Sequence, residues 1–262
     1  MKRTLRPGVA LCAALATLSL GVTACTTEPP SSSRPAPVTD PARAAPRPAP
    51  RAPVADHALD ARLIWAAAHN DAEQVRELLA SGADLETRGE QGRTPLIAAT
   101  KNRATAAARA LVEAGADVDA KDDLQDSAYL YAGAEGIDDI LELTLTHGAD
   151  LRSVNRYGGT ALIPAAEHGH ITTVRRLIAA GVDVDHTNNS GWTALHESIV
   201  YGDGSSRYQQ VVTALLTAGA DLSIPDSAGR TALDNAQRLG QSAIVRILRD
   251  HRNTGPSDEQ QR

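Results

Sequence analysis

The sequence is poor in cysteine and in aromatic residues. Its 262 residues include two cysteines, two tryptophans, five tyrosines and no phenylalanine. The cysteines are Cys12 and Cys25, and only Cys25 survives if the apolar N-terminus is removed on export. The folded part of the chain therefore uses neither a disulfide nor a thiolate metal site.

The familiar catalytic sequences are also missing. There is no GxSxG, CxxC, HExxH or P-loop sequence, and GDGSS at 202–206 lacks the lysine and the preceding strand of a phosphate loop. We therefore expect no catalytic residue, no cofactor and no metal.

Positive charge is scarce. Removing the three basic residues near the N-terminus leaves 26 − 3 = 23 Lys and Arg against 32 Asp and Glu, a net charge of about −9. A phosphate backbone requires a positive surface, so nucleic-acid binding is disfavoured. An acidic excess on a scaffold mostly serves solubility.

The first 24 residues have the pattern of a targeting segment. Lys2, Arg3 and Arg6 precede an uncharged apolar stretch at 9–20, which is too short to span a bilayer. The sequence VTAC at 22–25 resembles the lipobox of bacterial lipoproteins, in which the cysteine sulfur receives a diacylglycerol group and becomes the first residue. This resemblance implies that Cys25 is the lipidated N-terminus of the mature chain. The alternative is an ordinary signal peptide cut near Ala24.

Proline is concentrated directly after Cys25. Nine of the 14 prolines fall in residues 26–56, and most apolar residues there are alanine and valine. Such a segment cannot bury a core, so we expect a disordered, partly polyproline tether. The expected organisation is a signal peptide at 1–24, a lipidated cysteine and tether at 25–56, a folded domain at 57–252 and a disordered tail at 253–262.

Two strings recur in step after residue 57. The first is built around GAD, as in SGADLET and AGADVDA, and its glycines are Gly82, Gly115, Gly148, Gly181 and Gly219. The second runs as RTPLIAA or WTALHES, and its lead residues are Thr94, Ser127, Thr160, Thr193 and Thr231. Both sets are spaced by 33, 33, 33 and 38 residues. Two registers that agree over five units indicate a stacked array of repeats.

Each unit has the local chemistry of two short helices. The lead Thr or Ser should accept a backbone N–H as the N-cap of the first helix. The expected ends of the first helices are Gly136, Gly169, Gly202 and Gly240. The GAD glycine should close the second helix in the left-handed conformation, and the remaining polar residues should form a β-hairpin-like finger.

These strings and their period closely resemble those of the ankyrin repeat family over residues 58–251. The resemblance implies an all-α repeat solenoid of about six units, each a helix–turn–helix with a β-hairpin finger. The first unit lacks a leading finger and the last lacks a closing GAD, as in terminal units of a stack. Arg246, Arg249 and Asp250 on the last helix should face water.

Three places depart from the family pattern. Gln125 replaces a finger glycine, and Pro164 lies in the first turn of a helix, where it should remove one hydrogen bond. Unit five carries five extra residues around 202–208, either a tolerated surface loop or part of a working face.

The histidines first raise the question of chemistry. His168 and His170 could pair on a metal, but they fall where the repeat pattern itself runs xxGHxxxV. His196 holds a position where the family's histidine forms a hydrogen bond between repeats. Glu197 beside it is unusual, and a proton-transfer pair is conceivable, although neighbouring helix residues point to different faces.

The resemblance places the variable, partner-binding positions on the fingers. The rare aromatics Trp192 and Tyr157 should anchor an interface on units four and five, with Tyr201 extending it; the alternative for Trp192 is packing on the neighbouring finger. Trp65 is expected in the core with Leu63. The candidate partner-binding residues are Trp192, Tyr157, Arg156, Asn189, Arg93, Glu90, Leu124 and Tyr201.

The sequence thus indicates a membrane-tethered, exported scaffold that binds another protein through a concave face of fingers and first helices. It would be a monomer held by a lipid anchor at the outer side of the cytoplasmic membrane or in the periplasm. One alternative is a dedicated stabiliser of a co-exported enzyme. A further one is a hydrolase-type enzyme that uses Glu197, His196 and the 202–208 loop.

Overall fold

The computed structural model describes residues 57–254 as a stack of helix pairs. Cys25, the predicted signal peptide and the tether lie outside the described residues, as does all but the beginning of the predicted tail. Among the described residues, no helix is both long and apolar enough to cross a membrane.

Six units follow one another along the chain. Each contains a first and a second helix, and unit two also has a short 3₁₀ helix, η1 (Glu90–Gly92), in its finger. The first helices are α1 (His57–Ala68), α3 (Pro95–Lys101), α5 (Ala128–Ala134), α7 (Leu162–Glu167), α9 (Ala194–Val200) and α11 (Ala232–Arg238). The second helices are α2 (Ala72–Ala80), α4 (Thr105–Glu113), α6 (Asp138–Thr146), α8 (Ile171–Ala180), α10 (Ser206–Thr217) and α12 (Ser242–Thr254).

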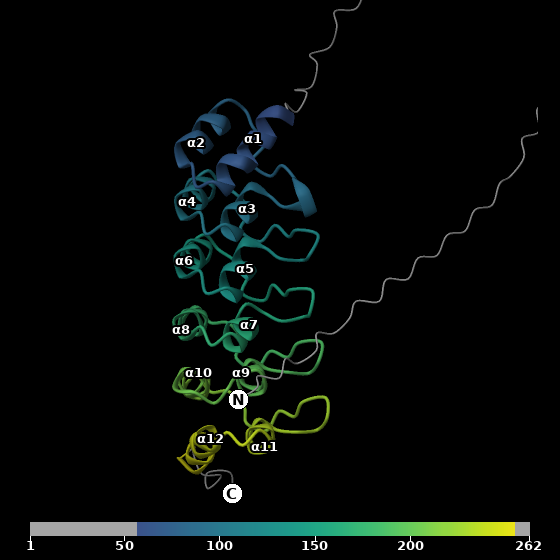
Figure 1. The fold of residues 1–262 in the computed structure, drawn as a ribbon, viewed down its shortest axis with the longest axis vertical. Helices are drawn as coiled ribbons and strands as arrows, with labels where there is room; N and C mark the ends of the chain where they lie inside the picture. Colours follow the sequence, from purple (N-terminus) through teal and green to yellow (C-terminus); the bar gives the residue numbers. More distant parts are fainter. Residues whose placement is uncertain (1–56, 255–262) are drawn as a thin grey trace, which may run out of the picture. The chain divides into compact units, whose positions relative to one another are not determined.

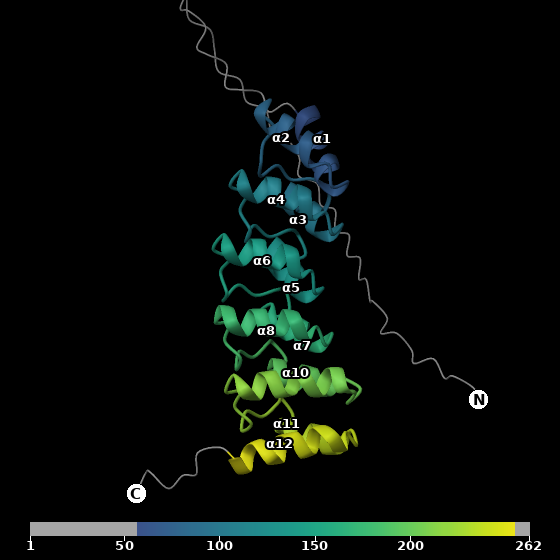
Figure 2. The same ribbon diagram turned by 90° about the vertical axis from the view of Figure 1, so that its left-hand side faces the viewer.

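The units stack into parallel layers. First helices form one column and second helices form another, and the fingers project beyond the first column, away from the second (Figure 1). The turned view shows the helix pairs at successive levels of the stack (Figure 2). This arrangement confirms the predicted all-α repeat solenoid of about six units.

The core is built from small and branched aliphatic side chains. Alanines at one register of the first helices have no exposed surface, which lets neighbouring units approach closely. They are Ala66, Ala99, Ala132, Ala165 and Ala236. Leucines of the second helices, such as Leu111, Leu177 and Leu215, are equally buried.

Four of the five predicted N-caps form. The hydroxyls of Thr94, Ser127, Thr193 and Thr231 each accept the backbone N–H three residues on. Thr160 is the exception, because its buried hydroxyl makes no hydrogen bond and α7 begins only at Leu162. Pro164 explains the difference: it has no N–H, and its ring crowds the carbonyl four residues earlier, that of Thr160.

Left-handed residues end most helices as expected. All five GAD glycines have φ between 83° and 93°. Gly136, Gly169 and Gly240 end first helices in the same region, but Gly202 does not. In unit five the extra residues move the left-handed position to Gly204, with φ of 72°. A Cβ at Gly202 would lie 2.1 Å from the carbonyl oxygen of Ser198.

Each finger is a short turn held by a few backbone hydrogen bonds rather than a ladder of strands; the described residues contain no β-strand. In unit three, the Asp122 N–H donates to the Asp126 carbonyl at 2.9 Å. The Asp122 carboxylate also accepts the N–H groups of Leu124 and Asp126, and this Asx turn fixes the fingertip. Asn155, Asn188 and Asp226 do the same in the later fingers.

A second set of side chains links the GAD loops of successive units. Glu86 accepts the N–H of Asp117 at 2.8 Å, Asp119 that of Asp150 at 2.8 Å, and Asp185 that of Asp221 at 2.8 Å. The corresponding position between the third and fourth of these loops is Arg152. A guanidinium has no acceptor, so this bond is missing between units three and four.

Two predictions about packing need correction. Trp65 is 55% exposed and stacks on His69 with ring centroids 4.0 Å apart. It lies two residues from the buried Leu63, about 200° around a helix, and so points away from the core. The surface-loop interpretation of 202–208 fits residues 202–207, which are exposed or half-buried, but not Tyr208, which lies in α10, is buried and donates its hydroxyl to the Glu167 carbonyl at 2.9 Å.

Candidate protein-binding site

A hollow lies between the fingers and the first helices of units three to five. It has a volume of about 660 Å³, and its walls come from α5, α7 and α9 and from the fingers that precede these three helices. We call it the finger groove. Arg156, Tyr157 and Tyr201 line it, so the structure brings three of the predicted partner-binding residues together.

Aromatic side chains are prominent at the groove. Tyr157 is 60% exposed and Tyr201 is 59% exposed. The Arg156 guanidinium lies over the Tyr157 ring, 4.6 Å from its centroid. Large exposed aromatics are typical anchors of protein interfaces.

Trp192 lies at the base of its finger and not at the tip. It is half-buried, and its ring centroid is 5.7 Å from that of Tyr201. Its backbone N–H donates to the Asn188 side-chain oxygen, as the finger turn requires. Trp192 therefore supports Tyr201 from the side, while the exposed Asn189 links its finger to the preceding one through the Tyr157 carbonyl.

Like Trp192 and Asn189, the other three candidates do not line the groove. Glu90 is exposed in η1, and Leu124 is 40% exposed on the finger of unit three. Arg93 is bonded to Gln91 and lies 3.9 Å from Asp122. Their proposed role in binding stays a prediction.

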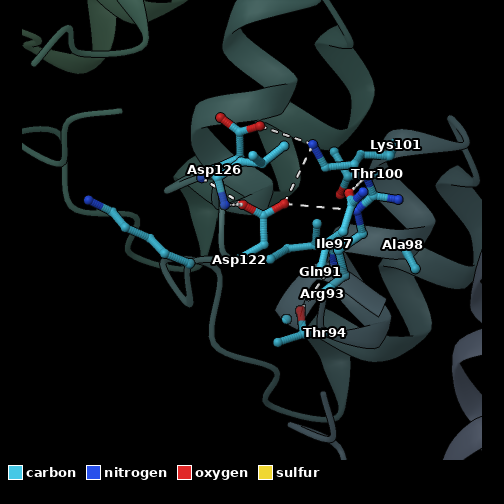
Figure 3. A network of polar contacts seen from close by, with 12 residues as sticks. Gln91, Arg93, Thr94, Ile97, Ala98, Thr100, Lys101, Asp122 and Asp126 are labelled. Carbon is cyan, nitrogen blue, oxygen red and sulfur yellow. Dashed lines mark hydrogen bonds and ion pairs between the residues drawn. The ribbon is translucent and has the colours of Figure 1, made fainter. Parts of the chain in front are cut away.

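Unit three contains a cation centre between its finger and the preceding helix. Lys101 Nζ, at the end of α3, is 3.0 Å from Asp126 and 3.6 Å from Asp122 (Figure 3). The same ammonium lies over the Tyr131 ring, 4.0 Å from its centroid. The Asp122 side chain has no exposed surface, so the lysine compensates a carboxylate that burial would otherwise destabilise.

Glu197 lines the groove two units further along. It is 6% exposed; its Oε1 accepts the Asn188 side-chain N–H at 2.8 Å, and its Oε2 has no hydrogen-bond partner. Burial, and then the nearby Glu167, raise the pKa of Glu197 to about 7, which the Asn188 hydrogen bond opposes. The carboxyl group is therefore close to half-protonated at neutral pH.

The structure does not join His196 and Glu197 into a proton-transfer pair. His196 Nδ1 lies 2.9 Å from the Thr193 hydroxyl, within a capping box, whereas Glu197 is bonded to Asn188. Burial lowers the pKa of His196, and the backbone of Arg230 in the next unit opposes this. That interaction with the Arg230 backbone joins His196 to the next repeat, as predicted, although His196 Nε2 forms no hydrogen bond of regular geometry among the described residues.

The HGH sequence serves the turn between α7 and α8. His168 Nδ1 lies 2.7 Å from the carbonyl of Ala134 in the preceding unit, and Gly169 is left-handed. The His168 and His170 rings meet edge to face with centroids 5.6 Å apart. Residues 57–254 contain no group of three or more His, Cys, Asp or Glu side chains placed to hold a metal ion.

Sequence reasoning missed Glu167, Asn188 and Tyr131, which also line the groove. The repeat period could have found them. Adding two periods, 66 residues, to Lys101, Asp122 and Tyr131 gives Glu167, Asn188 and Glu197. The lysine is thus replaced by Glu167, the aspartate by Asn188 and the tyrosine by Glu197.

Comparison with known proteins agrees with this architecture. The family model described as "Ankyrin repeats (3 copies)" matches residues 59–122 and 129–226, which is more than half of the chain. The chain therefore belongs to the ankyrin repeat family. A search of curated proteins found no match.

Solved structures give the same result. An ankyrin repeat domain from Acinetobacter baumannii AYE is 53% identical, with a TM-score of 0.71 over 72% of this chain and 97% of its own. Another ankyrin repeat protein is 42% identical, with a TM-score of 0.70 over the same shares. The ankyrin repeat domain of Bcl-3, an IkappaB family member, is 27% identical over 71% of this chain and 81% of its own, with a TM-score of 0.65. This fold implies a scaffold for protein–protein interaction.

Proposed function

We propose that this protein is an exported, lipid-anchored ankyrin repeat scaffold that binds another polypeptide through the finger groove. The observation that supports it is the hollow itself, where the exposed rings of Tyr157 and Tyr201 stand beside the buried carboxyl group of Glu197. An apolar rim around a few fixed polar groups is typical of recognition sites.

Binding through the groove can be tested by capture and titration. The full chain is used to capture partners from membranes, and the affinity of each identified partner is then measured. Tyr201→Ala and Trp192→Ala should each weaken binding at least tenfold, about 1.4 kcal/mol. Trp65→Ala is the matched control, because this exposed aromatic lies in α1, in the first unit, and does not line the groove.

Thermal unfolding separates binding from folding in the same variants. Tyr201→Ala should leave the Tm almost unchanged, since its side chain is mostly exposed. A partner that binds Tyr201→Ala and Trp192→Ala as tightly as the wild type, and loses affinity with Trp65→Ala, would place the interface elsewhere.

The anchor is supported by VTAC at 22–25 behind a charged and apolar leader. Two or more acyl chains give stable membrane attachment, whereas one gives only reversible binding. Cys25→Ser should move the protein from the membrane fraction to the aqueous fraction. A variant that stays on the membrane, together with a wild-type protein that carries no lipid mass, would disprove the anchor.

A further inference from the structure

Three buried carboxylates lie where a finger meets a first helix, and the chain neutralises two of them. Asp122 lies 3.6 Å from Lys101 Nζ, and Asp226 lies 3.0 Å from the Arg230 guanidinium. Neither aspartate side chain has any exposed surface. Glu197 is buried to a similar degree, yet it forms no ion pair within residues 57–254, and one of its oxygens has no hydrogen-bond partner there.

The repeat register shows what is missing beside Glu197. The position of Lys101 in unit two is held by Glu167 in unit four, and that of Tyr131 in unit three is held by Glu197 in unit five. In units two and three, the Lys101 ammonium contacts the Tyr131 ring. At the same two positions in units four and five, the chain has two acids, Glu167 and Glu197. An unpaired buried charge is unfavourable, so this arrangement calls for a cation from outside the chain.

The walls of the groove suit such a cation. They carry four carboxylates, Asp126, Glu135, Glu167 and Glu197, against one arginine, Arg156. Aromatic faces attract cations, and the groove exposes the rings of Tyr157 and Tyr201. The stacking of Arg156 on Tyr157 shows that a guanidinium fits against this surface.

We propose that the finger groove binds an arginine or lysine side chain of the partner polypeptide, with its cationic group against Glu197 and Glu167 and beside the rings of Tyr157 and Tyr201. This rests on the proposed function, since it takes the groove as the interface. It adds the chemistry of the partner: the segment that enters the groove is basic.

Proton release on binding is an expected consequence of this assignment. A bound cation favours ionised Glu197, whose pKa is otherwise raised to about 7 by burial, so binding should expel a proton and strengthen from pH 6 to pH 8. Asn188 donates a hydrogen bond to the same carboxyl group. The other titratable or charged groups facing the groove are Asp126, Tyr131, Glu135, Arg156, Tyr157, Glu167, His168 and Tyr201.

Blocked peptides provide a direct probe. Gly-Ser-Arg-Ser-Gly and the same peptide with citrulline, the uncharged isostere of arginine, are titrated against the full chain. The Trp192 indole N–H resonance reports binding at Tyr201, its ring neighbour. The arginine peptide should bind at least tenfold more tightly than the citrulline peptide, and the difference should grow from pH 6 to pH 8.

Two groove variants test the acids. Glu197→Gln keeps an acceptor for Asn188 but removes the charge, and Glu167→Lys places an internal cation at the register of Lys101. Each should reduce the affinity for the arginine peptide at least tenfold. Asp139→Asn is the control, because this carboxylate is exposed on α6, outside the groove.

Equal affinity for the arginine and citrulline peptides would overturn the proposal, as would unchanged binding in both groove variants. The chain's own arginines are another possible occupant. Binding that becomes tighter when Arg34, Arg43, Arg47 and Arg51 are all changed to Gln would overturn the assignment to a partner and give the groove to residues 26–56.

The captured partner separates this inference from the proposed function. If Tyr201→Ala releases the partner but Glu197→Gln does not, the groove is the interface and the basic contact is wrong. If neither variant releases it, the groove itself is not the interface. Release by both variants, with retention by Asp139→Asn, supports both.

Discussion

The centre at Asp122 and the centre at Glu197 occupy related layers of the same stack but are completed differently. At Asp122 the chain supplies Lys101 and encloses it between two carboxylates and the Tyr131 ring. At Glu197 the chain supplies only the amide of Asn188. Repeat proteins take their stability from contacts between neighbouring units, so one unit can carry an incomplete polar centre without loss of the fold. Both centres reach the groove, because Asp126 and Tyr131 line it as Glu197 does, but only the carboxyl group of Glu197 is left without a cation.

The comparison is tested most severely by removing the lysine. Lys101→Met keeps most of the side-chain volume but leaves Asp122 and Asp126 without their shared cation, and only Arg93, 3.9 Å from Asp122, remains nearby. The free energy of unfolding should fall by roughly 3 kcal/mol, as measured by urea unfolding at pH 7.

Arg176→Met is the matched control for that variant. Arg176 also bridges two carboxylates, Asp138 and Glu142, but its side chain is 40% exposed. Exposed ion pairs contribute about 0–1 kcal/mol. Equal destabilisation by the two variants would show that burial at Asp122 does not distinguish the two sites.

The Glu197→Gln variant tests the second centre through the pH dependence of the free energy of unfolding. The folded-state pKa of Glu197, about 7, lies above the ordinary value of 4.5, so the folded protein holds this proton more tightly than the unfolded chain. This contribution to stability is complete below pH 4.5 and is lost as the pH rises through 7. The variant removes the loss, so it should be more stable than the wild type at pH 8 by roughly 1–3 kcal/mol.

Unfolding of both proteins at pH 5 and pH 8 measures this difference. The advantage of the glutamine variant should be larger at pH 8 than at pH 5. A constant difference would mean that Glu197 is already ionised at pH 5 in the folded protein, and that the groove lacks the uncompensated carboxyl group described here.

The smallest effect concerns the finger that carries Asp122. Gln125 holds the place of the finger glycines with φ of 62°, a conformation that costs a non-glycine residue about 1–2 kcal/mol. Gln125→Gly should raise the free energy of unfolding by about 0.5–1 kcal/mol, because the gain is partly offset by the flexibility of glycine in the unfolded chain.

The reciprocal change is the control for the finger. At Gly229, with φ of 74°, an added Cβ would meet nothing within 4 Å, so Gly229→Gln introduces backbone strain without a clash. It should destabilise the protein by an amount similar to the gain at Gln125. A gain at Gln125 with no loss at Gly229 would point to contacts of the glutamine side chain rather than to backbone strain.

The repeat register predicted most of the fold because each unit obeys local rules. Capping by Thr94 and Thr231 and the left-handed GAD glycines follow from nearby backbone geometry alone. The predicted N-cap at Thr160 does not form, because Pro164 crowds the backbone four residues earlier. The predicted burial of Trp65 is wrong, because side chains two residues apart on a helix point to opposite sides and Leu63 points into the core.

The site was harder to predict because it depends on pairs from different units. Tyr157 and Tyr201 stood out by their rarity, and both line the groove. The compensation of Asp122 by Lys101 and the lack of a cation at Glu197 depend on contacts across layers. Such contacts become visible only when equivalent positions of successive units are compared, and the GAD and cap positions alone do not reveal them.

The arginine at position 152 leaves one joint of the stack without its hydrogen bond between GAD loops. At the neighbouring joints, a carboxylate of one GAD loop accepts a backbone N–H of the next loop, but the joint between units three and four lacks this hydrogen bond. Arg176, which bridges Asp138 and Glu142, and His168, at the Ala134 carbonyl, still join the same two units, so the missing bond loosens the GAD loops and not the whole joint. The finger groove extends from α5 to α9 and so crosses the joint. A polypeptide bound in the groove would contact the units on both sides of this joint. Amide hydrogen exchange in these units should therefore slow when the polypeptide binds.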